Sequence, residues 1–316
     1  MECFGLESPK LTYRDGWYYL TAAEGGTAGP PTSHMIVSSR SRSPLGPWEH
    51  SPYNPIVRTA SKDEYWWSRG HGTLFDTPDG KWYIAYHGYE REMTTLGRHS
   101  LRERIEWTAD GWFRVAESNG DSVERSRGCE QPFEDRFEGE TLDLRWQGHG
   151  AAPDEWCRLE AGALVLQGRD AGSPSPLLYM AAHPAYEAEI ELEVEGEAEG
   201  RLLLYYDGSA YMGVALSMDG VRYVRPFKRY GTVAQQEDVR YLRIRNDRHI
   251  VSFYYSADGQ HWTAYDKVAE ASGFHHNTFG GFLSLRIGID AVGEGLVRCR
   301  RFTYRPLLEE EATGYE

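Results

Sequence analysis

Residues 5–27 read GLESPKLTYRDGWYYLTAAEGGT, and the middle of this stretch is a pair of aromatic strands joined at Asp15-Gly16. Asp-Gly tolerates positive φ at both turn positions, which a two-residue hairpin requires. The pattern therefore predicts a chain built from hairpins, without an amphipathic helix of more than about ten residues. The same dipeptide recurs between apolar runs at Asp79-Gly80, Asp110-Gly111, Asp219-Gly220 and Asp258-Gly259.

The chain is predicted to fold as two all-β domains. Its 316 residues suffice for two domains, and residues 116–131, AESNGDSVERSRGCEQ, form a polar stretch without periodicity. We expect widely spaced hairpins over 1–118, as in four-stranded propeller blades, and a linker over 119–130. Alternating strands such as YEAEIELEVEGEAEGRLLLYYD predict a two-sheet sandwich or jelly roll over 131–306, with Glu at every second position facing solvent. Residues 307–316 are predicted to form a frayed acidic tail.

Charge and cysteine content exclude several classes of function. The net charge of −14 argues against nucleic acid or an anionic membrane as a partner, because phosphates bind basic surfaces. No apolar run approaches the roughly 18 residues of a membrane-spanning helix. Four dispersed cysteines favour reduced thiols over a disulfide framework or a zinc site. Because the first residues, MECFGLESPK, do not resemble a signal peptide, these features indicate a cytoplasmic protein.

Aromatic residues are abundant in this sequence. They make up 13% of the chain, including 10 Trp and 21 Tyr. Aromatic rings stack on flat apolar ligands such as sugars. They are also common in β-strands for reasons of packing alone, so both interpretations stay open.

Four motifs of the first domain resemble the second half of glycoside hydrolase family 43. They are GLESPKLTYRDGWYYLTAAEGGT, SHMIVSSRSRSPLGPWEHSPYNPI, SRGHGTLFDTPDGKWYIAYHGY and TLGRHSLRERIEWTADGWFRV, in this order over residues 5–115. Residues 133–305 are similar to the C-terminal sandwich of the family's β-xylosidases, through FEDRFEGETLDLRW and SADGQHW. The resemblance implies a partial five-bladed β-propeller followed by a concanavalin-like β-sandwich. It also implies an inverting β-xylosidase or α-L-arabinofuranosidase that removes terminal pentoses from xylo-oligosaccharides or arabinoxylan.

The resemblance assigns roles to individual residues. Glu7 of ESPKL matches the catalytic general acid, with Ser8 replacing the family's Gly or Ala. Arg98 of TLGRHSL matches an arginine that reaches the sugar, and His71 of RGHGTL matches a histidine at the propeller centre. Thr27 of AEGGT matches a threonine beside the sugar. The alternative for each is a structural role in an ion pair, a buried contact or a turn.

Three further expectations concern the surroundings of this site. The family's sandwich sends an aromatic side chain into the mouth of the active site, and Phe274 or Phe279 of GFHHNTFGGF is the candidate here. No metal ion or cofactor is required, although Ca²⁺ can sit in the propeller axis near His71. Water would hold most of it, because calcium takes about six to eight oxygen ligands. His34 of TSHM is expected to be a hydrogen-bonded structural histidine bordering the cleft.

The catalytic base that the resemblance implies has no counterpart in this sequence. Inversion needs a base about 6.5–9.5 Å from the acid. We expect it on N-terminal blades outside this sequence, either on a longer chain or on a second polypeptide, so that the chain alone is inactive. The alternative is a non-catalytic carbohydrate-binding or interaction module. The open sheet edges of half a propeller also favour association, for example as a homo-oligomer. The aspartates of the first domain, by contrast, fall in hairpins and turns: Asp15, Asp76, Asp79 and Asp110.

Overall fold

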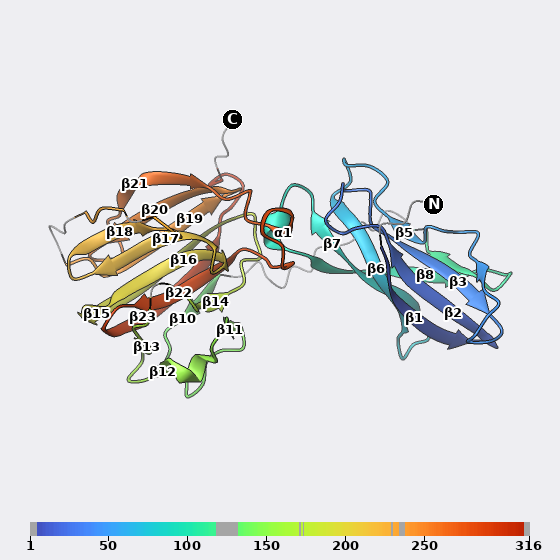
Figure 1. The fold of residues 1–316 in the computed structure, drawn as a ribbon, viewed down its shortest axis with the longest axis horizontal. Coiled ribbons are helices and arrows are strands. Elements are labelled where there is room, and N and C mark those ends of the chain that lie inside the picture. Colours follow the sequence, from blue (N-terminus) through green and yellow to red (C-terminus); the bar gives the residue numbers. More distant parts are fainter. Residues whose placement is uncertain are drawn as a thin grey trace. The chain divides into compact units, whose positions relative to one another are not determined.

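The computed structural model describes residues 5–117, 132–170, 172, 174–228, 230–233 and 238–312 (Figure 1). The chain divides into two compact units, Met1–Ser126 and Arg127–Glu316. Both units consist almost entirely of antiparallel strands, so the predicted all-β class is confirmed. In the described part of the chain no helix is long and apolar enough to cross a lipid bilayer. The predicted linker, 119–130, lies outside the described residues.

The first unit contains two antiparallel sheets of consecutive strands. In the first sheet the order is β1-β2-β3-β4, and β5 also pairs with β3. In the second sheet the order is β6-β7-β8-β9. Four-stranded meanders of this kind are the blades of a β-propeller, so the unit supplies two blades. The elements are β1 (Leu6–Arg14), β2 (Trp17–Glu24), β3 (Met35–Ser41), β4 (Glu49–His50), β5 (Val57–Arg58), β6 (Trp66–Asp76), β7 (Trp82–Glu90), the 3₁₀ turn η1 (Thr94–Leu96), β8 (His99–Trp107) and β9 (Phe113–Val115).

The three hairpins predicted in this unit form, but only one uses the predicted turn. Asp15 and Gly16 have φ values of 49° and 78°, so both central residues are left-handed, as in a type I′ turn. At Asp79-Gly80 and Asp110-Gly111 only the glycine has positive φ. There the loop is longer, and the backbone N–H of Thr77 donates to the carbonyl of Lys81 across it. The expectation of a two-residue turn was therefore wrong for these two hairpins.

One apolar core joins the two sheets of the first unit. Ile36 on β3 and Ile84 on β7 are fully buried in it, and so is Phe113 on β9. At the rim, the Arg40 guanidinium lies between the rings of Trp17 and Trp112, at 4.3 and 4.0 Å from their centroids. Arg40 also donates to the carbonyl oxygen of Asp110 at 2.8 Å, so a strand of one sheet is fixed to a turn of the other.

The second unit is a sandwich of two antiparallel sheets, as predicted (Figure 1). One sheet has the order β12-β13-β23-β15-β19-β20-β21, with β10 also on β23, and the other has the order β11-β14-β22-β16-β17-β18. The elements are β10 (Phe133–Asp135), β11 (Trp146–Gly148), the 3₁₀ turn η3 (Pro153–Glu155), β12 (Cys157–Leu159), β13 (Leu164–Gln167), β14 (Leu177–Tyr179), β15 (Ala185–Gly196), β16 (Glu199–Asp207), β17 (Ala210–Ser217), β18 (Gly220–Val224), β19 (Tyr241–Asp247), β20 (Ile250–Ser256), β21 (Thr263–Glu270), the short helix α1 (His276–Phe279), β22 (Arg286–Val292) and β23 (Gly295–Pro306).

The alternating glutamates of β15 face arginines on the neighbouring strands. Glu189 pairs with Arg243 of β19 at 2.6 Å, and Glu193 pairs with Arg300 of β23 at 2.7 Å. Glu187 is only 7% exposed. The predicted solvent-facing side of this strand is thus a ladder of cross-strand ion pairs, whose first carboxylate is buried.

The structure also bears on the predictions for the cysteines and for the C-terminal tail. Cys157 and Cys299 are free and buried, and burial raises the pKa of both thiols, to about 11 for Cys157. Cys3 and Cys129 lie outside the described residues. In the described part of the predicted tail, the Glu311 carboxylate accepts from Arg305 at 2.7 Å, and fraying of the tail stays a prediction.

Phe302→Ala tests the position of the sandwich core. Phe302 on β23 is fully buried, with its ring 4.8 Å from Trp146 and 5.2 Å from Tyr179. Its loss should lower the free energy of unfolding of the second unit by about 3–5 kcal/mol. Urea denaturation followed by tryptophan fluorescence measures this. The control Phe227→Ala, at a side chain that is 96% exposed, should change stability by no more than about 0.5 kcal/mol. Similar losses in the two variants would contradict the assignment.

Candidate functional site

Glu7 lies near the start of β1, where the strand is irregular. Its backbone pairs with Ala23, and the register shifts between Glu7 and Lys10. Ser8 has φ of 53°, and Pro9 contributes no N–H to the ladder. A bulge of this kind redirects side chains. The Glu7 carboxylate is 60% exposed, and its Oε1 lies 3.7 Å from Nδ1 of His71 on β6.

His71 occupies a second bulge, in the first strand of the other sheet. The pairing of β6 with β7 shifts register on both sides of Gly70, and His71 has φ of 65°. Position 70 admits only glycine. A β-carbon there would lie 1.7 Å from Cδ2 of His34, so the close approach of that ring requires glycine.

His34 is fully buried just before β3. Its Nδ1 lies 3.0 Å from the carbonyl oxygen of Gly25. A carbonyl only accepts, so Nδ1 carries the proton and Nε2 carries a lone pair. Nε2 is buried and has no hydrogen-bond partner among the described residues. The expectation of a hydrogen-bonded histidine therefore holds for Nδ1, whereas Nε2 has no partner among the described residues.

His87 on β7 completes a cluster of three imidazoles, which we call the histidine cluster: His34, His71 and His87. The His87 ring stacks on that of His34 at 5.3 Å between centroids and lies 5.6 Å from that of His71. Burial lowers the pKa of His34, and burial together with the Arg98 charge lowers the pKa of His87 to about 3. His34 and His87 are therefore neutral at ordinary pH.

Arg98 joins this cluster from the exposed loop between η1 and β8. Its Nη1 lies 3.4 Å from Nε2 of His87, close enough to donate a hydrogen bond. Glu7 thus lies beside His71, and Arg98 lies beside His87, which is the neighbour of His71. The roles predicted for Glu7, His71 and Arg98 stay predictions. His87 was missed, although it lies in the same motif as His71; in the structure it pairs with Gly70, next to His71. Thr27 is 8% exposed and lies in the β2–β3 loop that also carries Gly25 and His34.

The donor atoms around His71 are imidazole nitrogens with one nearby carboxylate. Calcium takes oxygen ligands, so these side chains do not fit a protein-held calcium ion. No catalytic step is assigned to one.

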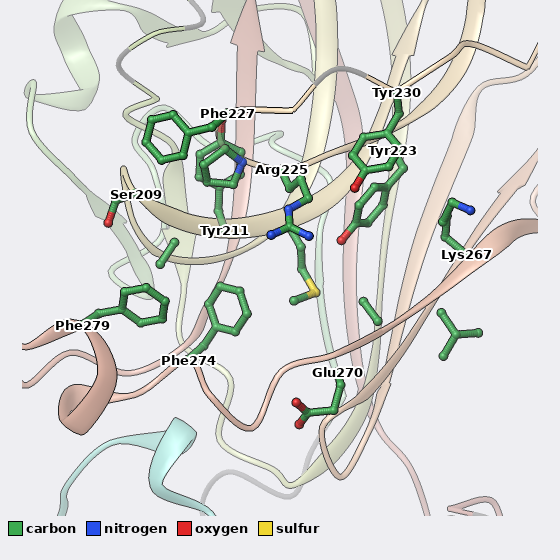
Figure 2. A pocket seen from close by; sticks show the side chains of 15 residues that line it. Ser209, Tyr211, Tyr223, Arg225, Phe227, Tyr230, Lys267, Glu270, Phe274 and Phe279 are labelled. Carbon is green, nitrogen blue, oxygen red and sulfur yellow. The ribbon is translucent and has the colours of Figure 1, made fainter.

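Phe274 and Phe279 lie at one end of a cleft in the sandwich, with a volume of about 430 Å³ (Figure 2). Their rings are 5.6 Å apart, and Phe279 also contacts the Tyr206 ring at 5.8 Å. Entry of one of them into the active-site mouth stays a prediction. The cleft is further lined by Ser209, Tyr211, Tyr223, Arg225, Phe227, Tyr230, Lys267 and Glu270.

Each of the two units matches a known family. Residues 1–113 match glycosyl hydrolases family 43, and residues 134–300 match the beta xylosidase C-terminal concanavalin A-like domain. The chain belongs to glycosyl hydrolase family 43. The predicted resemblance is confirmed.

Relatives within family 43 are longer than this chain. A non-reducing end alpha-L-arabinofuranosidase of Bacteroides ovatus is 32% identical over 51% of this chain and 32% of its own length. A xylan 1,3-beta-xylosidase of a Vibrio species is 26% identical over 81% of this chain and 55% of its own length. The chain thus spans about a third to a half of these two relatives. A crystal structure of a family 43 protein of Bacillus licheniformis matches with a TM-score of 0.82 at 24% identity, covering 97% of this chain and 66% of that one, which supports the propeller and sandwich folds.

Gly70→Ala tests the close approach of the β6 backbone to the His34 ring. The new methyl group would collide with the His34 ring, so the free energy of unfolding of the first unit should fall by about 1–3 kcal/mol. In a His34→Ala background the same change should cost clearly less, because the ring is gone. Denaturant unfolding of the single and double variants measures the coupling. Gly26→Ala, where a β-carbon meets only Gly29 N at 3.9 Å, is the control. Equal costs in both backgrounds would show that the ring does not limit residue 70.

Proposed function

We propose that this chain supplies the general acid and part of the sugar-binding site of an inverting glycosidase. The enzyme would remove terminal xylose or arabinofuranose from xylo-oligosaccharides or arabinoxylan. The observation that carries the proposal is the convergence of Glu7, His71 and Arg98 on one cluster. Inverting glycoside hydrolysis needs a general acid at the leaving oxygen and a base that activates water, and this cluster would supply the acid and the groups that orient it and the sugar. The xylosidases and arabinofuranosidase among the relatives support this substrate class.

Glu7 would donate the proton to the glycosidic oxygen as the bond breaks. A general acid must be held within hydrogen-bond reach of the leaving oxygen. The β1 bulge presents the Glu7 carboxyl group, and His71 at 3.7 Å is placed to orient it. Contacts of this kind are often long in a free enzyme and tighten in the complex with substrate.

Arg98 would hold the sugar rather than take part in proton transfer. Its guanidinium is exposed on one side and contacts His87 on the other. A planar group with five N–H donors can donate to two neighbouring hydroxyls at once. The His87 contact limits its rotation, and the loop that carries the buried Thr27 would form the wall beside the sugar.

The water-activating base would come from a segment outside these 316 residues. Inversion places the base across the sugar from the acid, at about 6.5–9.5 Å. The described strands of the first unit form two blades, whereas the resemblance implies five. A segment supplying the other blades would close the propeller axis and add the base, as part of a longer chain or as a second polypeptide. Without it, the chain should have no meaningful activity.

A second candidate function is carbohydrate binding by the sandwich without catalysis. The cleft in Figure 2 favours it, because aromatic rings line it together with Arg225, Lys267 and Glu270. Rings that stack on a sugar face and charged groups that reach its hydroxyls are the usual elements of a sugar site. The volume of about 430 Å³ falls in the range of about 300–1,000 Å³ that is typical of small-molecule sites.

Glu7→Gln tests the acid in the protein supplied with the remaining blades. Glutamine keeps the shape but has no proton to transfer. Hydrolysis of xylobiose should fall by about 10²–10⁴-fold, and hydrolysis of a nitrophenyl glycoside by much less, because nitrophenolate leaves without a proton. The basic limb of the pH profile should flatten as well. Release of xylose and of p-nitrophenol are the two readouts.

The matched control for the acid is Glu117→Gln, at a side chain that is 87% exposed, which should leave both rates unchanged. Equal losses on the two substrates in Glu7→Gln would make Glu7 an orienting residue. Full activity of the chain without added blades would place the base within it and contradict that part of the proposal.

Tyr230→Ala tests the second candidate. Calorimetric titration of the chain with xylo-oligosaccharides should give a measurable affinity if the cleft binds sugar. Loss of one stacking ring should weaken it by about 1 kcal/mol, or roughly fivefold. Tyr13→Ala, an exposed ring of the first unit, is the control. An affinity equal in wild type and Tyr230→Ala would exclude the cleft as the sugar site.

A further inference from the structure

The cleft of the sandwich carries positive charge in a strongly acidic chain. The net charge of the 316 residues is −14. Arg225 and Lys267 nevertheless line the cleft, together with a single carboxylate among the described lining residues, that of Glu270. Lys228 lies beside them, with its ammonium nitrogen 4.9 Å from the centroid of the Tyr230 ring. A local excess of cations in an acidic protein favours a ligand with negative charge.

The two cations of the cleft are available to a ligand. The side chains of Arg225 and Lys267 form no ion pair with the described residues. The Glu270 carboxylate, by contrast, is engaged, because it accepts from the backbone N–H of Ser272 at 2.5 Å. Figure 2 shows Arg225 pointing into the cleft beside Tyr223. Burial raises the pKa of the Tyr223 hydroxyl and the Arg225 charge opposes this, so the guanidinium is close to that group.

The cleft lies where the edges of the two sheets part. β18 ends the smaller sheet and β21 ends the larger one, and residues of both strands line the cleft. Met212 and Tyr223, which are buried in the sandwich core, form its inner wall. The Tyr223 ring packs on Phe253 at 5.1 Å and on Tyr230 at 4.9 Å between centroids. A ligand therefore meets aromatic rings that are already held in place.

Phe227 stands at the rim of the cleft in a conformation that folding alone does not explain. Its side chain is 96% exposed, although phenylalanine is usually buried. Arg225 and Lys228 pair as an isolated bridge, so Pro226 and Phe227 are the central residues of a turn. Phe227 has φ of 60°, where a turn with proline in the preceding position normally has glycine. Backbone strain of this kind clusters at ligand sites. An exposed ring next to Arg225 suits stacking on a sugar face.

We propose that this cleft binds a uronic acid, a sugar that carries a carboxylate, as a side group of a xylo-oligosaccharide; this rests on the second candidate function, sugar binding by the sandwich. Arg225 and Lys267 would hold the carboxylate, and Phe227 and Tyr230 would stack on sugar rings. A planar guanidinium fork pairs with both oxygens of one carboxylate. All four residues belong to the second unit, so binding depends neither on Glu7 nor on further blades.

The test is calorimetric titration of the chain with two probes, xylotriose and xylotriose that carries one glucuronic acid. The acidic probe should bind at least about tenfold more tightly, because hydrogen bonds to charged groups are the stronger ones. Added salt should reduce this preference, since ions screen exposed charges. Arg225→Gln should remove most of the preference and leave the affinity for xylotriose nearly unchanged. Lys267→Gln should remove part of it. Circular dichroism confirms that the variants are folded.

Two further variants complete the experiment. Arg104→Gln, at an exposed arginine of β8 in the first unit, is the matched control and should bind both probes as the wild type does. Phe227→Gly removes the ring and permits the positive φ, so it should weaken both probes by about fivefold without changing the preference.

The proposal is overturned if the two probes bind equally, if Arg225→Gln keeps the preference, or if acetate displaces the acidic probe as well as free glucuronic acid does. Equal binding of both probes would leave sugar binding by the sandwich standing. Binding of neither probe would remove that candidate function as well.

Discussion

The site depends on the absence of a side chain at Gly70. Only a glycine lets the β6 backbone pass over the buried His34 ring, and the bulge formed there gives His71 its positive φ and its direction toward Glu7. The two sheets therefore meet through a ring-on-backbone contact instead of through aliphatic side chains alone. The direction of the His71 side chain and the place of the His34 ring, on which His87 stacks, both depend on this one close approach.

Much of the fold could be predicted from period and turn residues. Alternation and Asp-Gly turns located the hairpins, because these signals are local. The Asp79 and Asp110 turns were predicted with the wrong geometry. In both, a threonine hydroxyl contacts the aspartate two residues on and helps close a longer loop, at Thr77 and at Thr108. The Asp-Gly dipeptide alone does not specify whether the turn has two residues or a longer loop.

The candidate site was predicted less completely. Glu7, His71 and Arg98 were selected through motif resemblance, and the structure places Glu7 beside His71 and Arg98 beside His87. His87 lies in the same quoted motif as His71, but its place opposite Gly70 depends on strand register across two bulges, which sequence periodicity does not encode. Likewise, the glutamates of β15 predict a polar face, but not that arginines of β19 and β23 would pair with them. The place of His87 and the ion pairs of β15 both depend on pairing between strands, which is set by residues far apart in the sequence.

The position of β23 in the sandwich has a consequence for how the protein is made. This last strand runs through the larger sheet between β13 and β15, and its pairs with β15 join residues on the order of a hundred positions apart. Such non-local pairing is slow to form. Until β23 has been synthesised, β13 and β15 are without their shared neighbour, so the larger sheet cannot close before this strand emerges from the ribosome. The described strands of the first unit pair with near neighbours in the sequence, so these pairs can form as soon as the strands emerge.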